Sequence, residues 1–511
     1  MGGELRVRRA SAVLTSVLVL GTTGLRPVSA TTSLAWQRCA HAPAPYECAR
    51  IPVPNDYRRP SSGQRTLSVI RLPARDPASR VGTLVVNPGG PGNSGVRYLP
   101  IAAGGQLSTV AERFDLVSFD PRGVGESGPV RCIDDGSRDA AAVRTNPFPT
   151  LRDLPGLVQH AVRTAAGCAY ESGGDLPLLT TAYAARDLDT IRSALGAEQI
   201  SYLGFSYGTY LGATYSSLFP HRLRAMALDG AVDPVQTARD PLGKDIEQAR
   251  GFENGLRRFF HHCDETPAEC SLTGDAERRF HGLLATVRRK PLAAPSGDPA
   301  RPVNAYVLVT GVQAALYARQ SWPFLGLALA QAEAGDGSLL QLASDVFRGR
   351  SADGSYEQWP DAFLAITAAD RDYPSSVAAF VLAAQRAAAT APTFGPLNVY
   401  SSLPAGLLRV NPAEDFEGPF TWQSSGPPAL VIGTLHDTAT PYRGAKAMTV
   451  QLGQAVLLSF DGDGHTAYGR GSACVDRAVT AYLIDLAIPA PNTMCGYDSP
   501  VVASFSSFAG R

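Results

Sequence analysis

The stretch G-F-S-Y-G (204–208) contains the residue of this chain best suited to nucleophilic chemistry. It fits the pattern G-x-S-x-G, in which a serine lies on a tight turn between a strand and a helix. The apolar run 200–205 leads into the turn, and 207–218 has apolar residues at helical spacing. Glycines flank the serine because side chains there would clash with the strand and helix. We predict that Ser206 is a nucleophile, the alternative being a serine in a glycine-rich loop.

A nucleophilic serine requires a general base, which in turn requires an orienting acid. After a turn of this kind, the order along the chain is serine, acid, histidine. Only His436 and His465 follow the long helical region described below. His465 lies in F-D-G-D-G-H-T-A-Y, just past the last expected strand, where a loop residue can reach the serine. We predict His465 as the base and keep His436 as the alternative.

The acid expected between the serine and the base is Asp437, in G-T-L-H-D-T-A-T-P after the penultimate strand. Asp229, at the end of the run 223–229, is a second candidate, because the acid can also follow this earlier strand. Asp461 and Asp463 lie too close to His465 in sequence to face it across a site.

The tetrahedral intermediate of acyl transfer requires N–H donors that are positioned in advance. One donor is expected from Tyr207, directly after the nucleophile. The other is expected from the glycine-rich loop V-V-N-P-G-G-P-G-N-S-G (85–95), with Gly90 as the first choice and Gly89 as the second. A nucleotide phosphate site is a poor alternative, since the loop matches neither G-x-x-x-x-G-K-[ST] nor G-x-G-x-x-G. No cofactor and no metal are predicted.

Short apolar runs alternate with helical patterns in the parts of the chain that carry these residues. Several runs lack alternation, as expected of central strands that are buried on both faces. The helical stretch 184–195 has Leu188, Ile191 and Leu195 on one face and ends at Gly196. The alternation predicts an α/β fold with a mainly parallel sheet. The expected strands are 65–72, 82–87, 114–120, 200–205, 223–229, 429–434 and 455–460.

The alternation stops after about residue 240, and 241–410 has a mostly helical pattern that predicts a cap inserted into the fold. Residues 31–240 and 411–511 are then the two parts of the core. Residues 1–30 have a basic start, an apolar run at 10–21 and small residues before 31, which together indicate a secretory signal peptide. An uncleaved anchor is the alternative, but the apolar run is shorter than the roughly 20 residues that a span requires. We therefore expect a secreted protein without stable membrane insertion.

Net charge and cysteine content limit the partners and the compartment of the protein. The chain has 46 Lys+Arg and 46 Asp+Glu, so nothing in its net charge favours a nucleic acid partner. Its eight cysteines suggest disulfides in an exported protein. Pairing between sequence neighbours is the simplest arrangement: 39–48, 132–168, 263–270 and 474–495. Zinc is a weaker alternative, because the sequence contains no C-x-x-C pair.

Several motifs occur together in one order: P-G-G-P-G (88–92), F-D-P-R-G-V-G-E-S (119–127), G-F-S-Y-G-T-Y-L-G, L-D-G-A-V-D-P (228–234), G-T-L-H-D-T-A-T-P (433–441) and G-H-T-A-Y (464–468). In these the chain resembles secreted tripeptidyl aminopeptidases, α/β-hydrolases related to prolyl aminopeptidase. The resemblance runs from about residue 35 to the C-terminus and is weakest in the cap. It implies a triad of Ser206, Asp437 and His465, oxyanion donors at Gly90 and Tyr207, and support of the acid loop by Thr440.

The resemblance also implies that cap carboxylates bind the ammonium group of the substrate. Their positions cannot be aligned here, and Glu247, Glu253 and Glu269 are the candidates. We therefore expect a serine aminopeptidase that releases short N-terminal peptides. The same machinery acting on a non-peptide amide or ester is the alternative, and a non-catalytic binding protein is a third possibility. The cap determines which substrate reaches Ser206, because function depends on the site rather than on the fold.

Overall fold

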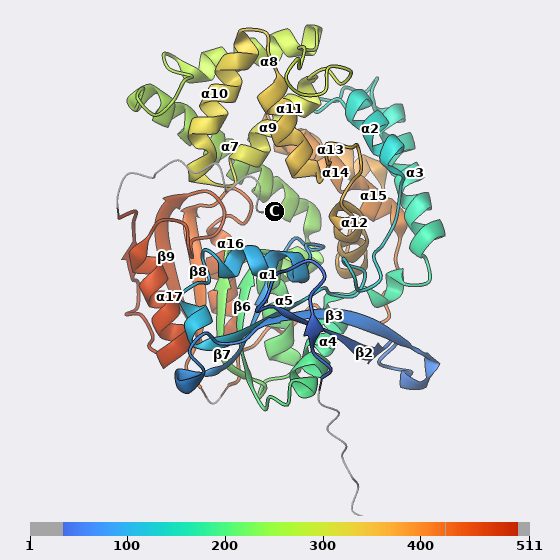
Figure 1. Cartoon of the computed structure of the whole chain (residues 1–511). Helices are drawn as coiled ribbons and strands as arrows, with labels where there is room; N and C mark the ends of the chain where they lie inside the picture. The colour runs from blue at the N-terminus through green and yellow to red at the C-terminus, as the bar shows by residue number, and fades with distance from the viewer. Residues whose placement is uncertain (1–33, 425, 499–511) are drawn as a thin grey trace, which may run out of the picture. The chain divides into compact units, whose positions relative to one another are not determined.

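A sheet of ten strands organises the computed structural model, which describes residues 34–498 apart from residue 425 (Figure 1). The strand order is β1-β2-β3-β5-β4-β6-β7-β8-β9-β10. The strands are β1 (Gln37–Arg38), β2 (Glu47–Pro54), β3 (Gln64–Leu72), β4 (Gly82–Asn87), β5 (Phe114–Phe119), β6 (Ile200–Phe205), β7 (Leu223–Asp229), β8 (Ala429–His436), β9 (Ala455–Asp463) and β10 (Met494–Cys495).

Most of the sheet is parallel, as predicted. Neighbouring strands from β5 to β10 run parallel, whereas β3 pairs antiparallel with both β2 and β5. Each of the seven runs expected to be strands forms one. The side chains of Leu84, Val85 and Val86 in β4 are fully buried. The lack of alternation in such runs therefore reflects burial on both faces of the sheet.

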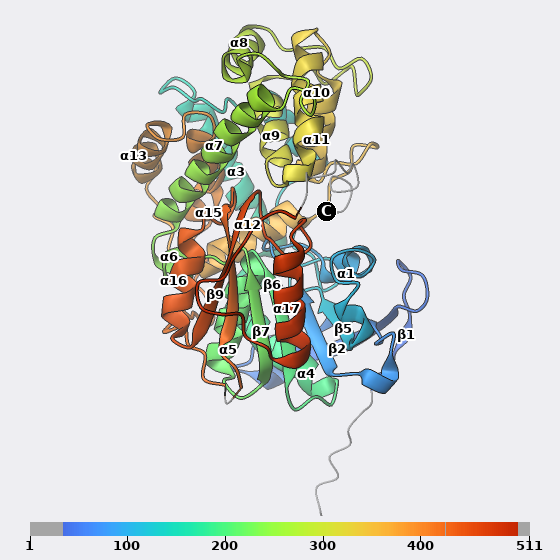
Figure 2. The ribbon, with the colours of Figure 1, turned by 90° about the vertical axis from the view of Figure 1, so that its left-hand side faces the viewer.

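Helices cover both faces of the sheet (Figure 2). On one face, α1 (Gly95–Ala103) and α17 (Ala473–Asp485) pack against alternate strand residues such as Leu84 and Val86. On the other face, α4 (Thr181–Ala194), α5 (Tyr207–Leu218) and α16 (Arg443–Leu452) pack against residues such as Val85. The carboxyl ends of the parallel strands consequently meet at one edge, where ligands bind in sheets of this type.

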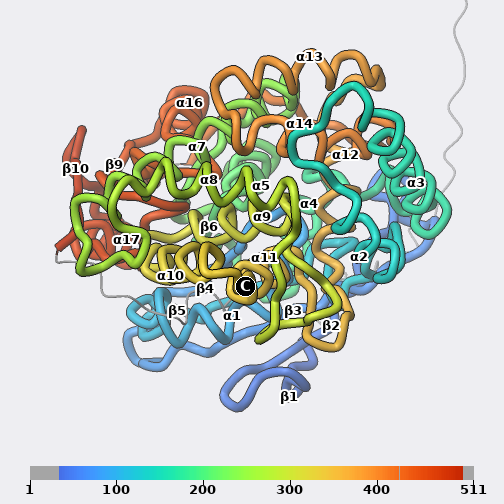
Figure 3. The backbone as a smooth tube through the Cα atoms, turned by 90° about the horizontal axis from the view of Figure 1, so that it is seen from above, coloured from blue at the N-terminus to red at the C-terminus, as the bar shows by residue number. Residues whose placement is uncertain are grey.

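An inserted helical region lies between β7 and β8 (Figures 1 and 3). It has its own apolar core, which includes Phe252, Phe259 and Trp322. The helices are α6 (Pro234–Arg239), α7 (Pro241–Glu265), α8 (Ala276–Arg289), α9 (Ala305–Ala315), α10 (Trp322–Glu333), α11 (Ser338–Arg348), α12 (Trp359–Asp370), α13 (Val377–Ala388), α14 (Gly395–Ser401) and α15 (Leu403–Leu408). The boundaries of the cap at 241 and 410 stay a prediction.

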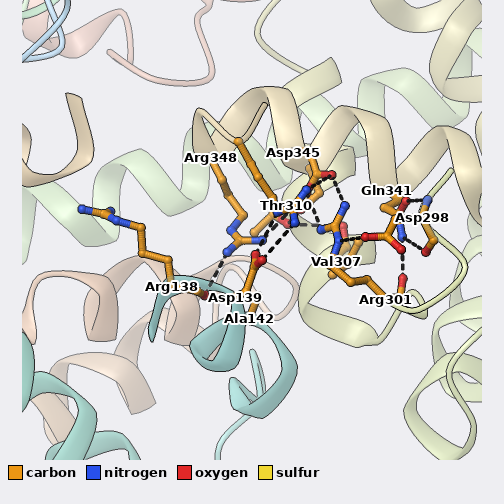
Figure 4. A network of polar contacts seen from close by, with 12 residues as sticks. Arg138, Asp139, Ala142, Asp298, Arg301, Val307, Thr310, Gln341, Asp345 and Arg348 are labelled. Carbon is orange, nitrogen blue, oxygen red and sulfur yellow. Dashed lines mark hydrogen bonds and ion pairs between the residues drawn. The ribbon is translucent and has the colours of Figure 1, made fainter. Parts of the chain in front are cut away.

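Two helices that precede the insertion in sequence also pack against it: α2 (Asp135–Arg144) and α3 (Leu154–Ser172). Ala161 of α3 belongs to one apolar cluster with Ile246 of α7 and Phe380 of α13. Figure 4 shows polar contacts that join α2 to the helical region, including a hydrogen bond of 3.1 Å from Arg348 Nη2 to the Arg138 carbonyl oxygen. Two helices from the range 31–240, which the sequence predicts as core, thus contact the inserted helices.

Four disulfides connect the cysteines as neighbour pairing predicted: Cys39–Cys48, Cys132–Cys168, Cys263–Cys270 and Cys474–Cys495. The predicted signal peptide at 1–30 lies outside the described residues. Within the part that is described, no helix is both long and apolar enough to cross a membrane.

Candidate active site

Ser206 lies on the tight turn between β6 and α5. Its φ of 55° is in the left-handed region, which is unusual for a residue other than glycine. A Cβ atom on Gly204 would lie 2.4 Å from the Gly208 carbonyl oxygen, and one on Gly208 would lie 2.8 Å from the Asn87 carbonyl oxygen. The two glycines are therefore required by the close approach of strand, turn and helix. The geometry is that of a nucleophile elbow.

An Asp–His pair lies on the loops that follow two adjacent strands, β8 and β9. His465 Nδ1 is 3.0 Å from Asp437 Oδ1 and 3.1 Å from Asp437 Oδ2. Thr440 donates its backbone N–H to Asp437 Oδ1 at 2.8 Å and its hydroxyl to Oδ2 at 3.0 Å. The N–H groups of Ala439 and Thr466 donate to the same carboxylate. Because the carboxylate is buried and held by several donors, it can fix the orientation of the imidazole.

The rival acid has a different role in the structure. Asp229 accepts hydrogen bonds from the N–H groups of Ala467 at 3.0 Å and Tyr468 at 2.8 Å, so its carboxylate holds the backbone that follows His465. Burial raises the pKa of Asp229 to about 6. The rival base, His436, lies 3.9 Å from Asp461 and does not line the cavity that contains Ser206. The structure thus brings His465 together with Asp437.

The glycine-rich loop after β4 packs directly against the nucleophile. A Cβ atom on Gly89 would lie 3.0 Å from Ser206 Cβ and 3.1 Å from the Tyr207 nitrogen. The Gly89 N–H donates to Asn87 Oδ1 at 3.0 Å, which leaves Gly90 as the donor to consider in this loop. Tyr207 begins α5, so its N–H is among the first-turn donors that a helix does not use itself. Gly90 and Tyr207 both line the cavity.

The cap contacts both loops of the Asp–His pair, which the sequence did not reveal. Gln248 of α7 donates from Nε2 to the Ala439 carbonyl oxygen at 2.9 Å. A Cβ atom on Gly251 would lie 2.6 Å from the Thr438 carbonyl oxygen. The His465 N–H donates to the Tyr317 carbonyl oxygen at 2.7 Å, and the two rings are 5.6 Å apart. Neither Gln248 nor Tyr317 belongs to a recognisable motif.

Ser206 and His465 open into one cavity of about 2140 Å³ between the sheet edge and the helices above it. The cavity exceeds the roughly 300–1,000 Å³ of small-molecule pockets, so it has room for an extended substrate. None of the three carboxylates predicted to receive a substrate amine lines it. Glu247 pairs with Arg250 at 2.8 Å, Glu253 accepts from Thr393 at 3.0 Å, and Glu269 lies 3.6 Å from His262. The structure does not bring these residues to Ser206.

The carboxylates that do line the cavity have partners within the protein. Asp245 accepts from the Tyr373 hydroxyl at 2.9 Å, and Asp361 pairs with Arg138 at 2.5 Å. Glu357 and Glu126 are more open, with 41% and 42% of their side chains exposed. Glu357 has Arg97 at 3.7 Å, and Glu126 has His41 at 3.1 Å. Among the described residues, no group of three or more His, Cys, Asp or Glu could hold a metal ion.

The fold and this arrangement define the class of protein. The sequence profile of the alpha/beta hydrolase fold matches residues 82–471, which extend from β4 past His465. The chain belongs to the α/β-hydrolase family. Its sequence relatives include a serine protease, a carboxylesterase and a tripeptidyl aminopeptidase. The chain is therefore a serine hydrolase of this family.

Three relatives are similar over most of their length. The chain is 33% identical to serine protease Hip1 of Mycobacterium tuberculosis over 467 residues, covering 88% of this chain and 87% of the relative. It is 39% identical to carboxylesterase B of the same species over 461 residues, covering 88% and 86%. It is 30% identical to tripeptidyl aminopeptidase of Streptomyces coelicolor over 489 residues, covering 91% and 86%. The resemblance to aminopeptidases of this family is confirmed.

Proposed function

We propose that the chain is a secreted serine peptidase that releases short peptides from free N-termini. The observation that carries the chemistry is that His465, paired with the buried Asp437, lines the same cavity as Ser206, which lies on a strained turn. The relatives named as a protease and as a tripeptidyl aminopeptidase support a peptide substrate. The four disulfides fit an oxidising compartment outside the cytosol.

In the proposed mechanism, Ser206 Oγ attacks the scissile carbonyl carbon while His465 accepts the hydroxyl proton. The oxygen of the tetrahedral intermediate accepts hydrogen bonds from the N–H groups of Gly90 and Tyr207. His465 then gives the proton to the leaving amine, so that the C–N bond breaks and an acyl-enzyme remains. A water molecule then attacks the acyl-enzyme in the same way, with His465 as the base. The ester bond to Ser206 breaks, and the peptide is released with a free carboxylic acid. Asp437 stabilises the imidazolium throughout.

Glu357 is the cavity carboxylate that we propose for the substrate ammonium group. It lies two residues before Trp359, whose carbonyl oxygen would be 2.7 Å from a Cβ atom on Gly92. The start of α12 therefore adjoins the glycine-rich loop beside Ser206. Burial raises the pKa of Glu357, and the Arg97 partner at 3.7 Å leaves oxygen acceptors for an amine.

A second candidate function is hydrolysis of an ester or a non-peptide amide by the same residues. Two observations favour it: the predicted amine-binding carboxylates do not line the cavity, and a relative at 39% identity is named carboxylesterase B. The two functions share the acyl-enzyme mechanism and differ in what the cavity walls recognise.

One assay distinguishes the two functions. A chromogenic tripeptide anilide of the Ala-Pro-Ala type is compared with its N-acetylated form, and p-nitrophenyl butyrate is the ester control. An aminopeptidase cleaves the free tripeptide at least tenfold faster than the acetylated one. Glu357→Gln is expected to reduce this ratio of rates by raising the KM for the free tripeptide. Preference for the blocked peptide, or cleavage of the ester alone, would reject the aminopeptidase proposal. Ser206→Ala removes labelling by a fluorophosphonate probe if Ser206 is the nucleophile.

A further inference from the structure

A group of hydrogen-bond donors lines the wall of the cavity formed by α7, α14 and the end of α12. We call Lys244, Gln248, Arg371 and Asn398 the donor subsite, and all four line the same cavity as Ser206. Lys244 and Gln248 lie one turn apart on α7. The α14 segment runs alongside, since the Phe252 and Phe394 rings are 5.7 Å apart.

The end of α12 joins this wall through Tyr373. Its hydroxyl donates to Asp245 Oδ2 of α7 at 2.9 Å and lies 3.2 Å from Ser402 Oγ, directly after α14. Arg371 lies two residues before Tyr373. The side chains of the donor subsite therefore belong to three segments that are held together by specific contacts.

The side-chain oxygen atoms of Gln248 and Asn398 already accept hydrogen bonds within the protein. The Lys244 ammonium donates to Gln248 Oε1 at 3.3 Å, while the Gln248 Nε2 group donates to Ala439. Asn398 Oδ1 accepts from Gln313 Nε2 at 3.4 Å. Asn398 is only 8% exposed, yet its Nδ2 group is buried without a hydrogen-bond partner among the described residues. A buried unpaired donor costs about 1–3 kcal/mol, and a ligand that accepts from it would offset this cost.

The charges of the donor subsite also favour an acceptor ligand. Asp245 is the carboxylate next to Lys244, at 3.7 Å, and it already accepts from Tyr373. Asp370 is bound by Thr181 instead, through hydrogen bonds of 2.7 and 2.6 Å, and burial raises its pKa to about 7. Within the described chain, Arg371 forms no ion pair with a carboxylate at 4.0 Å or less. Lys244 and Arg371 are both half-buried and share Asp245. Asp370 also attracts Arg371, but its raised pKa leaves it partly protonated near neutral pH, so the group keeps net positive charge.

We propose that the donor subsite binds a carboxylate of the substrate while Ser206 attacks the acyl group. This inference rests on the proposed function, since it assigns a substrate feature to the same cavity. The carboxylate comes either from the C-terminus of a short peptide or from an acidic side chain. Lys244 and Arg371 supply the charge, and the Asn398 amide supplies a directed hydrogen bond.

The test measures how well peptides protect Ser206 from labelling by a fluorophosphonate. Three ligands are compared: Ala-Ala-Ala with a free C-terminus, its C-terminal amide, and Ala-Glu-Ala amide. We expect at least one carboxylate-bearing peptide to protect at a concentration at least tenfold below that of Ala-Ala-Ala amide. Protection by the free acid identifies the C-terminus as the source, and protection by the glutamyl amide identifies a side chain.

Variants assign the preference to the donor subsite. Lys244→Gln and Arg371→Gln each reduce the preference for the carboxylate to threefold or less, whereas the exposed Lys290→Gln on the cap retains it. The rate at which each variant is labelled without a peptide shows whether it is folded. If Lys244→Gln does not fold by this criterion, Arg371→Gln and Asn398→Leu provide the test. Equal protection by acid and amide in the wild type, or a preference that survives both charge deletions, overturns the inference. Absence of labelling in the wild type contradicts the proposed function instead.

Discussion

Ser206 retains a left-handed backbone conformation that costs about 1–3 kcal/mol for a residue with a side chain. The packing of Gly204 and Gly208 against neighbouring backbone holds it there. The glycines around the turn and the order of serine, acid and histidine along the chain are both visible in the sequence, so the sequence alone predicts Ser206, Asp437 and His465 as a set. It could not identify Gln248 or Glu357, since cap residues follow no spacing rule.

At the residue scale, the two buried aspartates have separable roles. We predict that Asp437→Asn lowers kcat by about 10⁴-fold, because the amide no longer holds the imidazole in the productive tautomer. Asp229→Asn removes a charged acceptor from the N–H groups of Ala467 and Tyr468, so it lowers the melting temperature and reduces kcat far less. Steady-state kinetics and thermal unfolding of both variants check this. Near-normal kcat in Asp437→Asn would give the acid role to Asp229.

A pH dependence follows from the donor subsite. Burial, together with the neighbouring Arg371, lowers the pKa of Lys244 to about 8, and Asp245 opposes the shift. Lys244 is charged below this value and neutral above it, while Arg371 stays charged. The preference for a carboxylate over the matched amide is therefore expected to fall as pH rises from 7 to 9. The peptide amine titrates alike in both ligands, so it cancels in their ratio. In Lys244→Gln the fall around pH 8 is expected to disappear, leaving only the smaller change near pH 7 that ionisation of Asp370 beside Arg371 causes.

At the scale of elements, the sequence predicted the strands better than the packing of the helices. The central strands are continuous apolar runs bounded by turns, so their positions were evident. The strand β2, which lies next to the short edge strand β1, was missed because E-C-A-R-I-P-V-P mixes charges and prolines with apolar residues. The packing of α2 against the cap was also not predictable, since it depends on contacts with residues more than 200 positions away.

The attachment of α2 to the helical region is itself testable. Asp139 of α2 accepts two hydrogen bonds of 2.9 Å from Arg350 and one of 2.7 Å from Tyr356. We predict that Asp139→Asn destabilises the protein by about 1–3 kcal/mol, because Arg350 is largely buried and keeps only the more distant Asp345 at 4.0 Å as a charge partner. Chemical denaturation measures the change. The control is Arg278→Gln, which breaks an exposed ion pair and is expected to cost less than about 1 kcal/mol. Equal effects would contradict the attachment.

At the scale of the whole molecule, the disulfides stabilise segments of different length. Chain entropy predicts about 4 kcal/mol from Cys132–Cys168, which are 36 residues apart, and about 2 kcal/mol from Cys263–Cys270, which are 7 apart. Replacing each pair by serines should therefore lower stability more for the first pair. Thermal unfolding of the two double variants in oxidising buffer checks the order, and the reverse order would show that local strain outweighs loop length.

The glycines of α7 limit how this enzyme can be re-engineered. Gly251 lies against the carbonyl oxygen of Thr438, and a Cβ atom on Gly255 would lie 2.5 Å from Thr438 Cγ2. The helix that lines the substrate cavity is thus also a wall of the loop that carries Asp437. A cap transplanted from a relative to change specificity will displace that loop unless its first long helix brings small residues at both positions. Recognition and catalysis in this chain are therefore not exchangeable modules.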